Sequence, residues 1–308
     1  MKTNENTYHV PVLRDASIEG LNIAPNGVYV DVTFGGGGHA CAIFEKLQPE
    51  GKLIAFDQDP DALKNTWEAD NFLFVPSNFR FLANQLRAMN VSHVDGILAD
   101  LGVSSHQFDS ADRGFSLRFE GELDMRMNQS GTLTAKQIVN EYDEEELYRV
   151  FRNYGEIEGL KKLVDTLLRS RQSEKIHTTS ELTALLQPLA PRKKEHKFIA
   201  QVFQALRIEV NDEMAALREF LEQSAKVLRP GGRLVVISYH SLEDRLVKNF
   251  IKRGSFDGKI EKDFFGNVIK PFEEIVRKAV VPTEEEIALN NRARSAKLRI
   301  AERTHVGQ

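Results

Sequence analysis

A short β-rich run that leads into four consecutive glycines constrains the fold of this chain more than any other feature. The run is Val28–Val32, the glycines are Gly35–Gly38, and a helix candidate follows over His39–Leu47. Glycine reaches positive φ and lets the backbone approach a ligand closely. The first turn of the following helix offers free N–H groups. A strand, a glycine turn and a helix in this order predict a phosphate- or nucleoside-binding unit.

Strand and helix signals alternate after this unit. Three further strand candidates are Leu53–Phe56, Phe72–Val75 and Val94–Ala99. Between them, Asp59 with Pro60 is typical of a helix start, because proline at the first helical position sacrifices no hydrogen bond. A second helix candidate covers Phe81–Met89. Alternation of this kind predicts an α/β fold with a parallel sheet covered by helices on both faces.

The pattern becomes almost entirely helical between residues 134 and 224. Two pairs, Thr134 with Gln137 and Thr178 with Glu181, have the spacing of a capping box. Strand signals return only at Arg233–Ile237. We therefore expect one α/β domain interrupted by a helical insertion. The loop over residues 105–131 is long enough to predict a functional or mobile segment.

Composition excludes several classes of protein. The chain has 308 residues, a formal net charge of −4 and a single cysteine, Cys41, so neither an internal disulfide nor a cysteine-rich metal site is expected. The apolar runs, such as Leu234–Ile237, are too short to span a bilayer. The first residues, Met1–Asn6, lack the apolar core of a signal peptide. We predict a cytoplasmic location, no membrane association and no bound metal.

The glycine turn alone leaves the ligand open. Gly35, Gly37 and Ala40 fit the dinucleotide fingerprint, so NAD binding competes with other nucleoside cofactors. A plain tight turn is the third interpretation, but four glycines carry an entropic cost that such a turn could avoid. Asp57, about 20 residues on, ends the next strand, where a carboxylate can accept hydrogen bonds from ribose hydroxyls.

A second turn distinguishes these ligands. The stretch Leu228–Ile237 reads as a helix end, a turn at Pro230-Gly231-Gly232 and a buried strand. It resembles the entry to the fifth strand of class I methyltransferases. In that fold the strand ends Asp31, Asp57 and Asp100 would face one crevice.

Taken together, the motifs resemble the RsmH (MraW) family of bacterial methyltransferases. The matching stretches keep their order and span nearly the whole chain. They are His9–Leu13, Thr33–His39, Phe56–Pro60, Asp95–Ser105, Arg113–Ser116, Leu123–Met127, Phe203–Ile208, Ser241–Arg245 and Arg292–Arg299.

The resemblance implies a class I, Rossmann-like fold and S-adenosylmethionine as the cofactor. It also implies methylation of the N4 amine of a cytosine in small-subunit ribosomal RNA near the decoding site. We then expect residues 1–107 and 216–308 to form the catalytic domain and residues 108–215 to recognise substrate. The implied cofactor-binding residues are Gly37, Gly38, His39, Asp57, Phe79, Asp100 and Gln107.

Each of these residues also has a physical interpretation. Phe79 can pack on an adenine face. Asp100 ends the fourth strand, and we hypothesise that it accepts an N–H of the substrate amine, with Ser104 or Ser105 as an additional acceptor. Gln107 can reach a cofactor from the long loop. His240 could accept the proton lost from the amine, or it could bond to a neighbouring loop.

Clusters of basic residues predict an RNA surface, because Lys and Arg contact phosphates without reading sequence. Residues 296–300 alternate apolar and basic side chains as an edge strand would. The predicted RNA contacts are Arg192, Lys193, Lys194, Arg292, Arg294, Lys297 and Arg299, and the long loop adds Arg113, Arg118 and Arg126.

Other functions remain to be separated from this one. A methyltransferase of a protein or small molecule is the nearest alternative. An NAD-dependent oxidoreductase and a non-catalytic RNA-binding module are more distant ones. The sequence leaves the oligomeric state open between a monomer and a homodimer, and it does not decide whether free RNA or an assembled subunit is the substrate.

Overall fold

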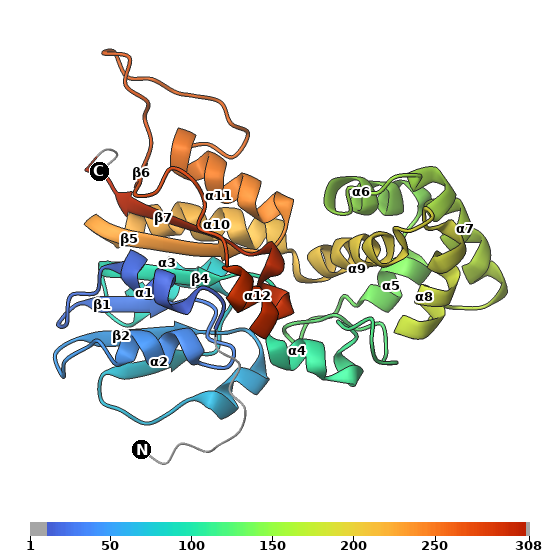
Figure 1. Cartoon of the computed structure of the whole chain (residues 1–308), viewed down its shortest axis with the longest axis horizontal. Coiled ribbons are helices and arrows are strands. Elements are labelled where there is room, and N and C mark those ends of the chain that lie inside the picture. Colours follow the sequence, from blue (N-terminus) through green and yellow to red (C-terminus); the bar gives the residue numbers. More distant parts are fainter. Residues whose placement is uncertain (1–10, 306–308) are drawn as a thin grey trace. The chain divides into compact units, whose positions relative to one another are not determined.

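A computed structural model describes residues 11–305 (Figure 1). The polar segment Met1–Asn6 and the first two residues of the stretch His9–Leu13 lie outside the described residues. The chain divides into two compact units. The first runs to Gly102 and resumes at Met214, and the second spans Val103–Glu213. Each unit is described separately.

A seven-stranded mixed sheet forms the centre of the first unit. Its strand order is β3-β2-β1-β4-β5-β7-β6. The first five strands in sequence are parallel, whereas β7 is antiparallel to both of its neighbours. The strands are β1 (Val28–Asp31), β2 (Lys52–Phe56), β3 (Phe72–Val75), β4 (Val94–Asp100), β5 (Leu228–Ser238), β6 (Phe272–Glu274) and β7 (Lys297–Arg303).

The order of the strands reverses direction between β1 and β4. The chain builds outward from β1 to β3 on one side and from β4 to β5 on the other. In open α/β sheets, ligands bind outside the carboxyl ends of the strands at such a switch point. The predicted α/β, Rossmann-like class is therefore confirmed, and the topology places a ligand site at the ends of β1 and β4.

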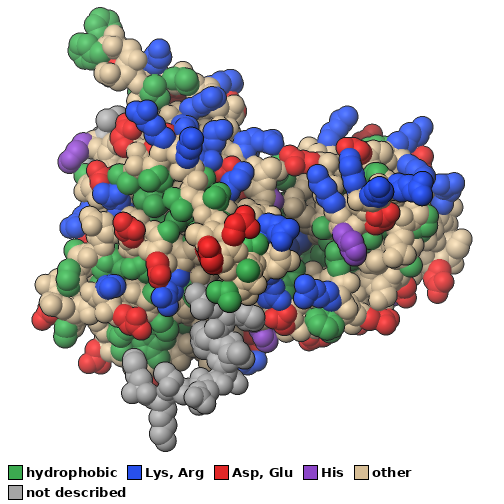
Figure 2. All heavy atoms as spheres, in the orientation of Figure 1, with side chains coloured by type: hydrophobic (Ala, Val, Ile, Leu, Met, Phe, Trp, Pro, Cys, Tyr) green, Lys and Arg blue, Asp and Glu red, His purple; other side chains and the backbone are tan. Residues whose placement is uncertain are grey.

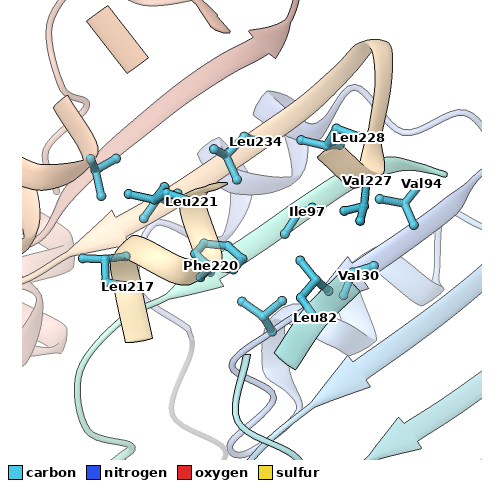
Figure 3. Close-up of a cluster of buried hydrophobic side chains, with 14 of the residues drawn as sticks. Val30, Leu82, Val94, Ile97, Leu217, Phe220, Leu221, Val227, Leu228 and Leu234 are labelled. Carbon is cyan, nitrogen blue, oxygen red and sulfur yellow. The ribbon is translucent and has the colours of Figure 1, made fainter. Parts of the chain in front are cut away.

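Alternating residues of the strands build two cores, one on each face of the sheet. On one face, Val30 and Ile97 pack against Phe220 and other residues of α3 (Leu82–Ala88), α10 (Glu213–Val227) and α11 (Ser241–Arg253) (Figure 3). On the other face, Tyr29 and Leu98 pack with residues of α1 (Arg14–Leu21) and α2 (Gly38–Phe44). Helices thus cover both faces of the sheet, and its central strands carry apolar residues on both sides, as expected of a parallel sheet.

The two helix candidates of this unit are present with shifted ends, as α2 (Gly38–Phe44) and α3 (Leu82–Ala88). Asp59 caps the segment after β2, accepting from the N–H of Asp61 at 3.0 Å, but this segment is a 3₁₀ helix. The helices are α1 (Arg14–Leu21), α2 (Gly38–Phe44), η1 (Pro60–Asn65), η2 (Phe79–Phe81), α3 (Leu82–Ala88), α10 (Glu213–Val227), α11 (Ser241–Arg253), α12 (Glu284–Leu289) and η5 (Asn291–Ser295).

The interpretation of residues 296–300 as an edge strand is wrong. They belong to β7, which lies between β5 and the three-residue strand β6. The alternation of exposed and buried side chains is real, with Leu298 fully buried and Lys297 exposed. It reflects one face packed on the core, and β6 is too short to give a strand signal of its own in the sequence.

The second unit is helical, and both predicted capping boxes are present. Thr134 and Thr178 each accept from the N–H three residues on, at 3.2 and 3.1 Å. Apolar faces of α5, α6, α7, α8 and α9 enclose one core. The helices are α4 (Ser105–Asp109), η3 (Ala111–Arg113), α5 (Ala135–Glu141), α6 (Glu144–Tyr154), α7 (Leu160–Ser173), α8 (Thr179–Leu186), η4 (Gln187–Leu189) and α9 (Glu195–Asn211). Among residues 11–305, no helix has the length and apolarity needed to cross a membrane.

Candidate active site at the carboxyl ends of the strands

The glycine loop after β1 is tied to the end of β2. The N–H of Gly35 donates to Asp57 Oδ2 at 2.7 Å, and the carbonyl of Gly35 accepts from Asn65 Nδ2 at 2.9 Å. Gly37 has φ +78°, and a Cβ there would lie 3.0 Å from the Phe34 ring. Both conformation and space therefore require glycine at position 37.

Gly38 is the first residue of α2 and is needed for a different reason. A Cβ at this position would lie only 2.3 Å from Pro11 Cγ. Its backbone is not in the positive-φ region. The absence of a side chain at Gly38 thus makes room for the chain segment that precedes α1.

Asp57 lies at the carboxyl end of β2, where the sequence predicted a ribose-binding carboxylate. Its Oδ1 accepts from the N–H of Asp59 at 2.8 Å, while Oδ2 accepts from Gly35. Burial raises the pKa of Asp57 to about 6, even though these N–H donors lower it. Backbone N–H groups thus fix the orientation of the carboxylate.

Phe79 follows β3 and begins η2. Its ring contacts Phe220 edge to face, with centroids 5.4 Å apart, and is partly buried against the core. Asn78 caps this turn and also donates to Gln58 Oε1 at 2.8 Å, which ties the ends of β3 and β2 together. The aromatic ring is thus held at the same edge of the sheet as Asp57.

Asp100 ends β4 between two ring side chains. The hydroxyl of Tyr239 donates to Asp100 Oδ1 at 2.8 Å. On the other side, His39 Nε2 lies 3.5 Å from Asp100 Oδ2. The N–H of Asp100 donates to Thr33 Oγ1 at 2.6 Å, so the loop after β1 also anchors this residue. The structure brings the predicted residues His39 and Asp100 together.

Asp31, at the end of β1, is fully buried. Its Oδ1 accepts from the N–H of Thr33 at 3.0 Å, but within the described part of the chain neither its Oδ2 nor either ring nitrogen of His39 has a hydrogen-bond partner. Burial raises the pKa of Asp31 to about 6, although His39 lowers it. Burial lowers the pKa of His39, but Asp100 and Asp31 outweigh this and raise it above its usual value.

Gln107 belongs to the second unit. Its carboxamide oxygen accepts from the N–H of Ser104 at 3.0 Å, and Ser104 Oγ accepts from the N–H of Gln107. The pair is a capping box at the start of α4. A role for Gln107 toward the cofactor, and for Ser104 toward the amine, remains a prediction.

His240 has the structural role that the sequence left open. It caps α11, with Nε2 3.0 Å from Glu243 Oε1 and Nδ1 facing the N–H of Glu243 at 3.5 Å. Glu243 in turn accepts from the N–H of Tyr239 at 2.9 Å. The start of α11 therefore orders the chain that leaves β5.

The predicted RNA contacts fall into exposed and engaged groups. In the second unit, the three adjacent residues Arg192, Lys193 and Lys194 are exposed in the turn before α9. In the first unit, Arg299 is mostly buried and its Nε donates to Asp244 at 2.7 Å, while Lys297 lies 3.3 Å from the same carboxylate. In η5, Arg294 is exposed and Arg292 is partly buried.

The arginines of the long loop mainly hold that loop. Arg113 is buried, donates to the carbonyls of Arg126 and Met127, and lies 5.9 Å over the Phe115 ring. The expectation that Arg113 contacts phosphate is therefore wrong. Arg126 pairs with Asp124 at 2.6 Å and donates to two loop carbonyls, whereas Arg118 is exposed.

Two residues of the site were missing from the sequence prediction of cofactor contacts and catalysis. Sequence patterns assign no role to Tyr239 and mark Asp31 only as a strand end. A signal existed for Asp31, because an acidic residue that ends a buried strand beside a glycine loop is costly without a functional partner. No sequence signal predicts the hydrogen bond from Tyr239 to Asp100, since it depends on the register of β4 and β5.

These features define a Rossmann-like enzyme whose ligand site, at the switch point, contains three carboxylates and an aromatic ring. The chain belongs to the MraW methylase family, which matches residues 6–304. It is 57% identical to the ribosomal RNA small subunit methyltransferase H of Parabacteroides distasonis, over 98% of this chain and all of that one. It is 56% identical to the enzymes of the same name from Amoebophilus asiaticus and Flavobacterium johnsoniae, over 97% and 96% of this chain and 96% and 98% of theirs.

The predicted methyltransferase class and its cofactor, S-adenosylmethionine, are thereby confirmed. The residues present fit this group. The fixed Asp57 carboxylate would hold the ribose hydroxyls, Phe79 would contact the adenine, and the backbone at Gly37 would lie against the cofactor. The buried polar atoms of Asp31 and His39 that lack partners among residues 11–305 are the kind of groups that a polar, charged ligand satisfies.

Proposed function

We propose that this chain transfers a methyl group from S-adenosylmethionine to the N4 amine of a cytosine in small-subunit ribosomal RNA, near the decoding site. The observation that carries the proposal is the position of Asp100 at the switch point, flanked by Tyr239 and His39. The names of the close relatives support the choice of ribosomal RNA as substrate. A ribosomal substrate also supports a cytoplasmic location.

The chemistry explains why an acceptor carboxylate matters. The lone pair of a cytosine N4 amine is delocalised into the ring, so the amine is a weak nucleophile. An oxygen that accepts one of its N–H groups favours a pyramidal nitrogen with a more available lone pair. S-adenosylmethionine supplies the methyl group when bound. Asp100 would hold and orient the amine for in-line attack, which is mainly a positioning effect.

The helical unit is the proposed substrate-recognition region, with the exposed turn Arg192–Lys194 as its phosphate contact. Figure 2 shows many Lys and Arg side chains on the visible face of this unit. In the first unit the candidates are Arg292, Arg294, Lys297 and Arg299, of which Lys297 and Arg299 both donate to Asp244. Such phosphate contacts would position the RNA without reading its sequence. The target cytosine would also have to be unstacked from its neighbours to reach the methyl group.

The proposal is tested by labelled methyl transfer to small subunits from a strain that lacks this protein, followed by mapping of the modified base. We expect one N4-methylated cytosine near the decoding site. Free RNA and assembled subunits are compared as substrates in parallel. Modification of another atom, or transfer only to a protein or small molecule, would contradict the proposal.

The role of Asp100 is tested in the same assay with Asp100→Ala and Asp100→Asn. Loss of an acid–base or orienting group typically costs about 10²–10⁴-fold in rate. We expect both variants to lose at least about 100-fold in the single-turnover rate. If either variant binds the cofactor normally and methylates at the wild-type rate, Asp100 is not the acceptor.

The RNA surface is tested by changing Arg192, Lys193 and Lys194 together to serine. A matched control removes three positive charges from α7 of the same unit, at Lys161, Lys162 and Arg169. The first variant should bind RNA less tightly, and its affinity should depend less steeply on salt. With fewer phosphate contacts, fewer counterions are released from the RNA on binding. Equal effects in both variants would mean that only net charge matters.

A further inference from the structure

Tyr239 reaches Asp100 because of the register between two neighbouring strands. In that register Asp100 is paired with Ile237, and the N–H of Leu101 donates to the Ile237 carbonyl at 3.0 Å. Tyr239 lies two residues beyond Ile237, so it continues on the same side of the chain. Its hydroxyl then donates to Asp100 Oδ1 at 2.8 Å.

The backbone of Tyr239 is fixed from the other direction by the start of α11. Glu243, which is 2% exposed, accepts from the N–H groups of Tyr239 at 2.9 Å and His240 at 3.3 Å. His240 in turn caps the helix. Hydrogen bonds to the buried Glu243 therefore fix the backbone of Tyr239, which limits how far the phenol can follow Asp100 if that carboxylate rotates.

Toward Asp100 the phenol acts as a hydrogen-bond donor. Burial raises the pKa of Tyr239 well above its usual value, and the nearby carboxylates of Asp100, Glu243 and Glu286 raise it further. The hydroxyl therefore stays protonated at any pH where the protein works. It cannot take up the proton that the substrate amine loses, and its available role is to hold the carboxylate.

We propose that Tyr239 is a positioning residue that fixes the plane of the Asp100 carboxylate for methyl transfer. Tyr239 occupies Oδ1 and His39 lies beside Oδ2, so the two rings limit rotation of the carboxylate from both sides. The lone pairs of Asp100 that Tyr239 does not occupy would then stay oriented toward the acceptor amine. This inference rests on the proposed function, in which Asp100 orients that amine.

A merely structural hydrogen bond is the competing explanation, and the chain contains a matched control for it. Tyr29 is a buried tyrosine at the opposite end of the same sheet, and its hydroxyl accepts from the N–H of Ala24 at 2.7 Å. Tyr29→Phe and Tyr239→Phe each remove one hydroxyl and one hydrogen bond. The two variants differ in the partner of the lost hydrogen bond: Asp100 belongs to the candidate active site, and Ala24 does not.

The experiment measures single-turnover methyl transfer to small subunits, affinity for S-adenosylhomocysteine and the thermal midpoint for both variants. A hydrogen bond to a charged group corresponds to roughly 10- to 100-fold in rate. We expect Tyr239→Phe to lose about that much in the transfer rate while its cofactor affinity stays near wild type. Tyr29→Phe should lose comparable thermal stability and retain the full rate. A wild-type rate for Tyr239→Phe, or a rate loss matched by lost cofactor affinity, overturns the inference.

A second readout does not depend on activity. Burial lowers the pKa of His39 while Asp100 and Asp31 raise it, so this histidine reports the charge on Asp100. Without the phenol, the Asp100 charge is less compensated, and the pKa of His39 should rise further in Tyr239→Phe but not in Tyr29→Phe. NMR titration of the imidazole resonances measures it, with His39 assigned by its absence in His39→Gln.

The two measurements separate the two proposals. If the wild-type protein transfers no methyl group to small subunits, the proposed function fails. The NMR titration still decides whether Tyr239 holds Asp100. An unchanged pKa of His39 in Tyr239→Phe would show that the hydrogen bond is absent in solution, and it would overturn the inference whatever the activity.

Discussion

At the amino ends of the parallel strands a partly buried acid forms an ion pair with an arginine, whereas at the carboxyl ends a buried acid has no such partner among the described residues. Asp95, near the start of β4, accepts from the N–H of Val28 at 2.6 Å and lies 2.5 Å from Arg229 Nη2. Asp31, at the end of the neighbouring strand β1, has no Lys or Arg partner and one unpartnered oxygen among residues 11–305.

The two edges show how the same residue types serve stability or function. A buried carboxylate is costly unless donors or a cation satisfy it. Asp95 at the amino edge meets that condition, and Arg229, near the start of β5, supplies the cation. At the carboxyl edge backbone N–H donors only partly offset burial, and burial raises the pKa values of Asp31 and Asp57 to about 6. The carboxyl edge is arranged to be completed by a ligand.

The largest contrast is expected between Asp57→Asn and Asp95→Asn. Asp57 would accept two ribose hydroxyls, and hydrogen bonds to a charged group contribute about 1.5–3 kcal/mol each. Asp57→Asn should weaken binding of S-adenosylhomocysteine by about 100-fold, measured by calorimetry. Asp95→Asn should lower the thermal midpoint through its lost ion pair and leave cofactor affinity unchanged. Similar effects of both changes on affinity would remove the distinction between the edges.

Asp31→Asn should stabilise the cofactor-free protein at pH 7. The folded-state pKa of Asp31, about 6, exceeds the ordinary 3.8, so the folded protein binds this proton more tightly than the unfolded chain. Its contribution to stability is therefore present at low pH and is lost as the pH rises from about 4 to 6. The difference between these two pKa values limits the effect of Asp31 on the free energy of unfolding to about 3 kcal/mol, since one pKa unit is about 1.36 kcal/mol.

Denaturant unfolding of the cofactor-free protein at pH 5 and pH 7 measures this effect. The wild-type protein should be less stable at pH 7 than at pH 5. The raised pKa of Asp57 contributes to this loss of stability in the same direction, and the raised pKa of His39 adds a further loss at higher pH. Asp31→Asn should lose its share of that dependence. If the variant is less stable than wild type at pH 7, a partner satisfies Asp31 in solution and the contrast between the edges fails.

The contrast also explains which parts of the molecule could be predicted from sequence. Strand ends such as Asp57 and Asp100 follow from local patterns, because a buried apolar run has to end at the edge of the sheet. Capping by Thr134 and Thr178 is equally local. The bond from Tyr239 to Asp100 joins residues 139 positions apart and could not be predicted without the register of β4 and β5.

Two wrong predictions have the same physical origin. A run of alternating side chains in β7 could not reveal that three residues of β6 cover it, because pairing partners leave no mark on the strand itself. Arg113 reads as a free charge in the sequence, yet it satisfies two carbonyls of its own loop. The sequence correctly predicted a strand at β7 and a charged side chain at Arg113. It could not predict their partners, because these depend on how other segments of the chain pack against them.

The smallest contrast compares two glycines in the positive-φ region. Gly37 at the carboxyl edge has φ +78°. Gly231, near the start of β5, has φ +80°, and apart from Gly231 and its two chain neighbours no heavy atom of residues 11–305 lies within 4 Å of the position that a Cβ would take there. Left-handed backbone costs a non-glycine residue about 1–2 kcal/mol, so Gly231→Ala and Gly37→Ala should both lose about that much stability. Gly37→Ala meets the Phe34 ring as well and should lose slightly more.

Cofactor binding separates these two variants. Gly37→Ala also places a methyl group where the backbone would lie against the cofactor, so its affinity for S-adenosylhomocysteine should fall, whereas Gly231→Ala should bind as wild type does. Thermal unfolding with and without S-adenosylhomocysteine measures both quantities, because a ligand that binds only the folded state raises the midpoint. An equal rise in midpoint for both variants would place the cofactor away from Gly37, and the glycine loop would then shape only the turn that holds Asp57.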